Sequence, residues 1–184
     1  MTSAETTTGT TTIDERTDLL EALATRRQFL RYTVRGLTDD QARQRTTASA
    51  LCLGGLVKHV AEVERGWADF ILEGPSAAAG GGWDGEEPTQ EVIDSWTAKF
   101  QLLPDETLAG VLAEYEEVAR RTDELVRTLP DLGVSHPLPE APWFEKGKRW
   151  SFRQVFLHII GETTQHAGHA DIIRESLDGQ KTMG

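Results

Sequence analysis

The sequence predicts an all-α protein, a bundle of four long amphipathic helices joined by long connections. Apolar residues recur at three- and four-residue spacing in four long segments. Two irregular segments, 73–88 and 130–149, separate these helical patterns, and the second holds four of the seven prolines. No segment shows a sustained two-residue alternation bounded by turn residues, so no strand is predicted.

The chain divides into a short tail and one domain. Residues 1–12 are almost all Thr, Ser, Ala, Glu and Gly, a composition that predicts disorder because it offers little apolar surface to bury. Residues 13–180 are predicted to form a single domain, since a chain of 184 residues suits one domain with a sizeable core.

The first half of the domain is predicted to hold two long helices. The pattern indicates one helix from Asp14 to about Gly36, a short helical turn at 39–43, and a second long helix over 49–72. Gly54 and Gly55 weaken the second helix by about 1 kcal/mol each relative to alanine. Such a pair inside a helix indicates that another backbone or a ligand approaches closely.

The second half follows a Gly- and Pro-rich loop at 73–88, in which Trp83 is placed either to cover a pocket or to pack the loop. A shorter helix over 89–103 is expected to lead into a third long helix over 104–129. After the irregular segment 130–149, Ser151 is the expected N-cap of the last helix, which ends before Gly179.

Four potential metal ligands share one strip of the last helix. At about 100° per residue, His158, Glu162, His166 and His169 fall at roughly 0°, 40°, 80° and 20°. Apolar neighbours indicate that the strip faces inward: Phe156, Ile159, Ile160, Ile172 and Ile173. Buried imidazoles and a carboxylate are costly without compensation, and a divalent metal supplies it. The alternative is a set of hydrogen-bonded core histidines.

One helix usually supplies two ligands at four-residue spacing, so a third must come from elsewhere. His59, in the middle of the second long helix, is the expected third ligand. His136 has no partner nearby in the sequence and is left outside the site. The single cysteine, Cys52, excludes an intramolecular disulfide and is interpreted as a small core residue.

Charge and hydropathy exclude two classes of partner. A formal net charge of −11 argues against nucleic acid, because phosphate binding needs a basic surface. No apolar stretch is long enough to span a bilayer, and the N-terminus lacks the basic and apolar regions of a signal peptide. A soluble cytoplasmic protein is expected.

Two stretches carry a family resemblance. Leu-Val-Lys-His-Val-Ala-Glu-Val-Glu-Arg-Gly-Trp at 56–67 and His-Ile-Ile-Gly-Glu-Thr-Thr-Gln-His-Ala-Gly-His at 158–169 resemble the DinB-like superfamily of metal-binding four-helix bundles. Within it, the chain is similar to the group related to mycothiol-dependent maleylpyruvate isomerase and thiol S-transferases. Carried over by position, the metal ligands are His59, Glu162 and His166.

The resemblance also bears on the two remaining histidines of the strip. His169 stands where many relatives have Gln, and we interpret it as a catalytic residue beside the metal, although direct ligation stays open. His158 lies one turn before the ligand pair and is either a residue behind the ligands or part of the cavity wall.

The resemblance implies an enzyme that activates a low-molecular-weight thiol, mycothiol or a related one, for S-transfer to, or isomerisation of, a small electrophilic substrate. Zn is the first choice of metal, with Ni, Fe or Mn as alternatives. Trp143, Arg149 and Arg153 are the expected contacts to thiol or substrate, and a homodimer stays open. The competing functions are a metal-dependent hydrolase and a non-catalytic, stress-associated metal-binding protein.

Overall fold

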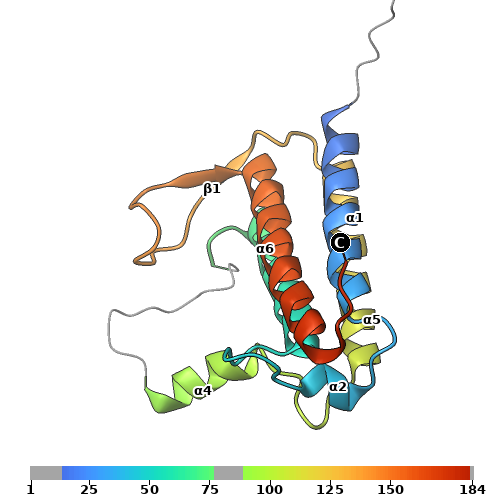
Figure 1. The fold of residues 1–184 in the computed structure, drawn as a ribbon. Helices are drawn as coiled ribbons and strands as arrows, with labels where there is room; N and C mark the ends of the chain where they lie inside the picture. The colour runs from blue at the N-terminus through green and yellow to red at the C-terminus, as the bar shows by residue number, and fades with distance from the viewer. Residues whose placement is uncertain (1–13, 77–88, 183–184) are drawn as a thin grey trace, which may run out of the picture.

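A computed structural model describes residues 14–76 and 89–182 of the chain. These residues form six helices and one two-stranded antiparallel ribbon (Figure 1). In chain order the elements are α1 (Glu15–Thr33), α2 (Asp39–Arg43), α3 (Leu53–Glu73), α4 (Gln90–Ala98), α5 (Leu108–Thr128), β1 (Ser135–Pro137), β2 (Arg149–Ser151) and α6 (Phe152–Asp178). The all-α prediction is confirmed. The expected tail and Trp83 lie outside the described residues.

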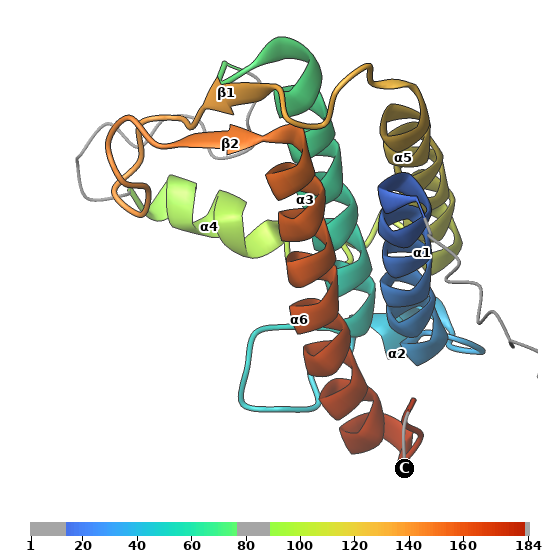
Figure 2. The same cartoon turned by 90° about the horizontal axis from the view of Figure 1, so that it is seen from above.

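The four long helices α1, α3, α5 and α6 form the predicted bundle. Each packs mainly on two others, α1 on α6 and α5, and α3 on α5 and α6, while α1 and α3 also touch across the interior. Side chains from all four fill the interior, among them Leu23, Leu30, Leu56, Val60, Val111, Val126, Phe156 and Ile159. The helix α4 and the ribbon extend from the bundle to the same side (Figures 1 and 2).

Local signals fix the helix ends. The Ser151 hydroxyl accepts a hydrogen bond from the backbone N–H of Gln154, and Gly179 adopts a left-handed φ of 78°, so both predicted ends of α6 are confirmed. The sulfur of Cys52 caps α3 by accepting from the N–H of Gly55. Cys52 is also buried, as expected of a core residue.

The sequence-based boundaries differ from the structure in several places. The second long helix begins at Leu53 rather than near residue 49, and the shorter helix ends at Ala98 rather than near residue 103. The prediction of no strand is wrong, because β1 pairs with β2 in the register Ser135↔Ser151. Three-residue strands are too short to show an alternating pattern. The third long helix begins at Leu108 rather than near residue 104, and Thr107 is its N-cap.

The close approach expected at the glycine pair of α3 is confirmed. A Cβ atom on Gly55 would lie 1.9 Å from the carbonyl oxygen of Phe100, and one on Gly54 would lie 2.8 Å from the Leu102 side chain. The segment that follows α4 therefore crosses α3 with direct backbone contact. This crossing brings the Phe100 ring to the middle of α3.

A buried ion pair also joins three of the helices. Arg27 of α1 binds the carboxylate of Glu64 in α3 at 2.5 Å and that of Asp123 in α5 at 2.7 Å. Burial alone would lower the pKa of Arg27, but the two carboxylates more than offset that effect and raise it. Arg27 and Glu64 each stand four residues after a buried apolar residue, Leu23 and Val60, so the helical periodicity places both on the buried faces of their helices.

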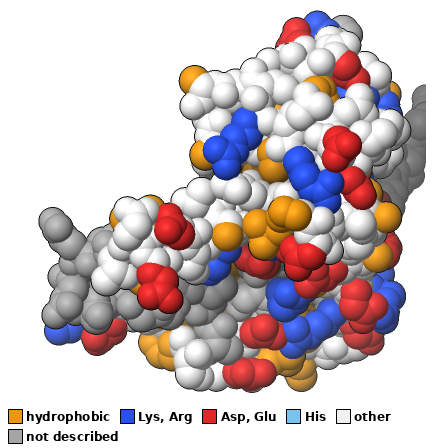
Figure 3. Space-filling view, turned by 90° about the horizontal axis from the view of Figure 1, so that it is seen from below, with side chains coloured by type: hydrophobic (Ala, Val, Ile, Leu, Met, Phe, Trp, Pro, Cys, Tyr) orange, Lys and Arg blue, Asp and Glu red, His pale blue; other side chains and the backbone are white. Residues whose placement is uncertain are grey.

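The surface is mixed in charge. On the face shown in Figure 3, acidic and basic side chains lie among one another rather than in separate patches. Ion pairs between α3 and α5 have the same character, as in Arg65 with Glu114 and Arg121 with Asp69. None of the described helices is both long enough and apolar enough to cross a membrane.

Candidate metal centre

Three of the predicted ligands converge between α3 and α6. One potential ligand atom from each of His59, Glu162 and His166 lies within 4.8 Å of the other two. The Nε2 atom of His166 is 3.6 Å from Oε2 of Glu162. Two ligands bound to one tetrahedral metal at 2.0–2.1 Å lie about 3.4 Å apart. The spacing of His166 and Glu162 and the donor atoms of all three residues therefore fit a divalent cation such as Zn²⁺.

Helix geometry and packing place these side chains. Glu162 and His166 are four residues apart on α6 and so occupy one side of that helix. His59 reaches them from α3, and its ring meets the ring of His166 edge to face, with centroids 4.8 Å apart. The Phe100 ring also packs against His59, with centroids 4.1 Å apart, and its centroid lies 6.4 Å from that of His166.

The strip on α6 lies at the border of the buried face rather than deep inside. His158, Glu162 and His169 are partly exposed, while the His166 side chain is 12% exposed. Ile172, which was expected to flank the strip inside the protein, is 62% exposed. Periodicity gives the direction of a buried face but not its width. Because of its position at the border, small molecules can approach the ligand group.

The electrostatics of the site favour neutral imidazoles. Burial lowers the pKa of His59 to about 4, and His166 and Lys99 contribute to that lowering. Burial also lowers the pKa of His166, against the opposite effect of Glu162. A metal binds the deprotonated nitrogen of histidine, so these shifts favour metal binding at neutral pH.

The two remaining histidines of the strip lie on either side of the ligand pair. The Nε2 atom of His158 is 3.6 Å from Oε1 of Glu162, the oxygen that does not face His166. The Nδ1 atom of His169 is 3.5 Å from Nδ1 of His166. His166 therefore directs one ring nitrogen toward Glu162 and the other toward His169. A ligating histidine commonly uses its second nitrogen in this way to fix its ring.

Replacing His169 with glutamine should preserve metal binding but change catalysis. The introduced amide retains hydrogen-bonding capacity beside His166 but cannot carry a proton near neutral pH. We expect metal content equal to the wild type and a changed pH profile of kcat. Elemental analysis and activity measurements across pH check this, with Gln165→Ala, an exposed position on the same helix, as the control. Metal loss in His169→Gln would instead place His169 among the ligands.

The structure does not bring the other predicted contacts to the histidines. Trp143 is 61% exposed and lies beside Phe144. The Arg149 guanidinium donates to the hydroxyl and the carbonyl of Ser135, at 3.1 and 2.5 Å. Arg153 forms an ion pair with Glu15 of α1. Both arginines are thus held by other parts of the fold.

Sequence reasoning missed four residues that surround the site. The rings of Trp67 and Trp150 each lie 4.9 Å from His158, and Phe100 and Lys99 lie close to His59. Trp67 is eight residues after His59, roughly on the same side of the helix, and this spacing was the available signal. The others reach the site through the ribbon and the crossing segment, which leave no periodic pattern.

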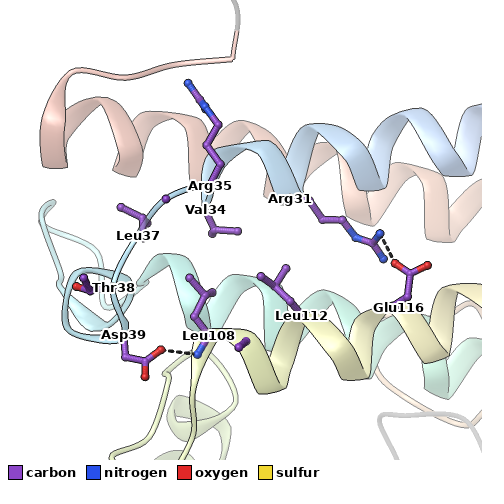
Figure 4. A pocket seen from close by; sticks show the side chains of 11 residues that line it. Arg31, Val34, Arg35, Leu37, Thr38, Asp39, Leu108, Leu112 and Glu116 are labelled. Atoms are coloured by element: carbon purple, nitrogen blue, oxygen red, sulfur yellow. Dashed lines mark hydrogen bonds and ion pairs between the residues drawn. The ribbon is translucent and has the colours of Figure 1, made fainter.

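A separate hollow lies away from the histidines, between the C-terminal end of α1, α2 and the start of α5 (Figure 4). Its volume is about 700 Å³, and its apolar wall includes Val34, Leu108 and Leu112. At its rim Arg31 pairs with Glu116, and the backbone N–H of Leu108 donates to Asp39. The hollow contains none of the predicted ligands.

A four-helix bundle in which two helices share a His–Glu–His group is the arrangement of a DinB-like protein, and this chain is one. More narrowly, it belongs to the mycothiol-S-transferase family, whose model matches residues 18–179. The resemblance seen in the sequence is thereby confirmed. The family indicates a metal-dependent, mycothiol-related transferase.

Solved structures agree on the fold. A conserved protein from Enterococcus faecalis is 15% identical, with a TM-score of 0.61, over 92% of this chain and 100% of that one. A protein from Streptococcus pneumoniae is 12% identical, with a TM-score of 0.58, over 91% and 90% of the two chains. At these identities the likeness is one of fold. A search of curated proteins found no match.

Proposed function

We propose that the protein binds one divalent metal through His59, Glu162 and His166 and transfers a small thiol, mycothiol or a related one, to a small electrophile. The observation that carries the proposal is the convergence of three ligand atoms from two helices within 4.8 Å. Membership of the mycothiol-S-transferase family supports a thiol as the co-substrate.

The donor set supports an enzyme rather than a structural metal site. Structural zinc sites are usually closed by four ligands and often contain cysteine, whereas catalytic sites keep three protein ligands and an open position. Two imidazole nitrogens and one carboxylate suit Zn²⁺ first, and Ni, Fe or Mn as alternatives. A divalent metal in such a site lowers the pKa of a thiol that binds it.

The chain's own residues would then perform three tasks. His59 and His166 offer neutral nitrogens, and Glu162 supplies one negative charge, so the protein ligands only partly neutralise a divalent cation. We propose His169, in contact with His166, as the residue that accepts the proton released by the thiol. Lys99, at the C-cap of α4, is a cation whose charge contributes to the lowered pKa of His59, and we propose it in place of Arg149 and Arg153 as the contact for anionic groups.

Cobalt substitution tests the thiol directly. A Co²⁺–thiolate bond gives an intense near-ultraviolet charge-transfer band that water and carboxylate ligands do not give. Titrating the Co²⁺ form with mycothiol should produce this band, with glutathione as the comparison thiol. The band should be lost in His59→Ala, which removes one of the three ligands.

The absence of a Co²⁺–thiolate band would count against the proposal. A wild-type protein that holds Co²⁺ but shows no band with any cellular thiol would contradict thiol activation. The same ligand group would then point to a hydrolase, in which the metal activates water.

A further inference from the structure

We propose that His158 is a positioning residue that holds the Glu162 carboxylate in the orientation needed to bind the metal. Its Nε2–H group would face Oε1 of Glu162 and leave Oε2 for the metal. The inference rests on the metal binding of the proposed function, but it concerns a residue outside the three ligands.

The first argument is the geometry of the Glu162 carboxylate. Its two oxygens face different histidines, Oε1 toward His158 and Oε2 toward His166, each with an N–O distance of 3.6 Å. Within residues 14–76 and 89–182, these two histidines are the only ion-pair partners of Glu162. In the same residues its carboxylate accepts no hydrogen bond from any other side chain or from the backbone. A glutamate side chain has several rotatable bonds, so an oriented carboxylate needs a partner on the oxygen that the metal does not use.

The second argument is that His158 is itself held in place. Its ring packs against two indoles, with centroids 4.9 Å from both Trp67 and Trp150. The indoles stack on each other at 5.0 Å, and Trp67 is almost fully buried. Trp150 belongs to β2, where it pairs with His136 of β1. The ribbon therefore fixes the ring that faces Glu162.

A packing role alone does not account for this arrangement. An apolar ring would pack against the two indoles equally well, and an imidazole that is partly removed from water costs free energy unless its polar atoms find partners. The Nε2 atom of His158 is directed at the carboxylate, at a distance that a small side-chain rotation closes to a hydrogen bond.

Two substitutions separate positioning from packing. His158→Phe keeps an aromatic ring packed against Trp67 and Trp150 but removes the donor to Glu162. His158→Gln restores an N–H group at nearly the position of Nε2. The affinity of the purified protein for Co²⁺ alone, from its visible absorption, is the readout. We expect His158→Phe to weaken binding by about 10-fold or more and His158→Gln to recover most of the loss.

The visible spectrum and the metal-free fold complete the test. The Co²⁺ spectrum of His158→Phe should change shape because the carboxylate is no longer held, while the metal-free variant should unfold at the temperature of the metal-free wild type. Wild-type Co²⁺ affinity in His158→Phe, or equal weakening in both variants, would overturn the positioning role. A wild type that binds Co²⁺ but transfers no thiol would overturn the proposed function alone. A wild type that binds no divalent metal would overturn both.

Discussion

Replacing Gly55 with alanine should destabilise the protein by about 3 kcal/mol, at the upper end of the usual cost of overpacking a core. The new Cβ atom would lie 1.9 Å from the carbonyl oxygen of Phe100, 2.2 Å from its carbon and 2.5 Å from the next backbone nitrogen. All three atoms belong to the backbone, so no side-chain rotation relieves the clash. The gain in helix propensity, about 1 kcal/mol, offsets only part of this cost.

The comparison for this variant is Gly161→Ala. Gly161 lies inside α6, is exposed, and has nothing within 4 Å of the position of a Cβ atom. Alanine there should stabilise the protein by about 0.5–1 kcal/mol. Urea unfolding of both variants measures the difference through the midpoint at an unchanged slope. A Gly55→Ala midpoint at or above the wild-type value would mean that the crossing segment moves aside at no cost.

The double variant His59→Ala, His166→Ala should lose the metal altogether. It removes one ligand from α3 and one from α6 and leaves Glu162 as the only member of the group. Elemental analysis of the purified protein should fall from about one metal per chain to near zero. His136→Ala is the matched control, because His136 packs against Phe70 and Phe152 and its Nε2 lies near the carbonyl of Ile71. Metal content equal to wild type in the double variant would exclude these ligands.

The same assignment predicts how metal affinity depends on pH. Protons compete with the metal for the imidazole nitrogens, so affinity falls as the pH falls. Burial lowers the pKa of His59 to about 4 and also lowers the pKa of His166. The steep loss of metal affinity should therefore begin at a pH below the ordinary histidine pKa of about 6.5. A metal titration at several pH values locates this range.

Local periodicity predicted the features that depend on one helix at a time. The spacing of His158, Glu162 and His166 placed them on one side of α6, and the glycine pair of α3 indicated a close approach. The first follows from the fixed rotation per residue of an α-helix, and the second from the missing Cβ atom of glycine. His59 was added by its place in a second helix and by family resemblance, and the packing of α3 on α6 brings it to the pair.

The parts that could not be predicted depend on contacts between distant segments. Trp150 reaches His158 only because β2 pairs with β1, and Arg149 is held by Ser135 through the same ribbon. Arg153 is held by Glu15 of α1, more than a hundred residues earlier in the chain. The sequence around Arg149 and Arg153 contains no sign of these partners. Both arginines were predicted to contact the thiol or the substrate only because of their position near the start of the last helix.

The ion pair that Arg27 makes with Glu64 and Asp123 has a consequence for how the helices are aligned. An apolar interface between helices tolerates a slip of one turn, about 5.4 Å, because one leucine can replace another. A buried guanidinium does not tolerate it, since a slip of α1 would part Arg27 from carboxylates that lie 2.5 and 2.7 Å away. An unpaired charge in a dry interior costs about 3–5 kcal/mol. The three charges thus select one alignment of α1, α3 and α5, and with it the height at which α3 presents His59, one of the proposed metal ligands.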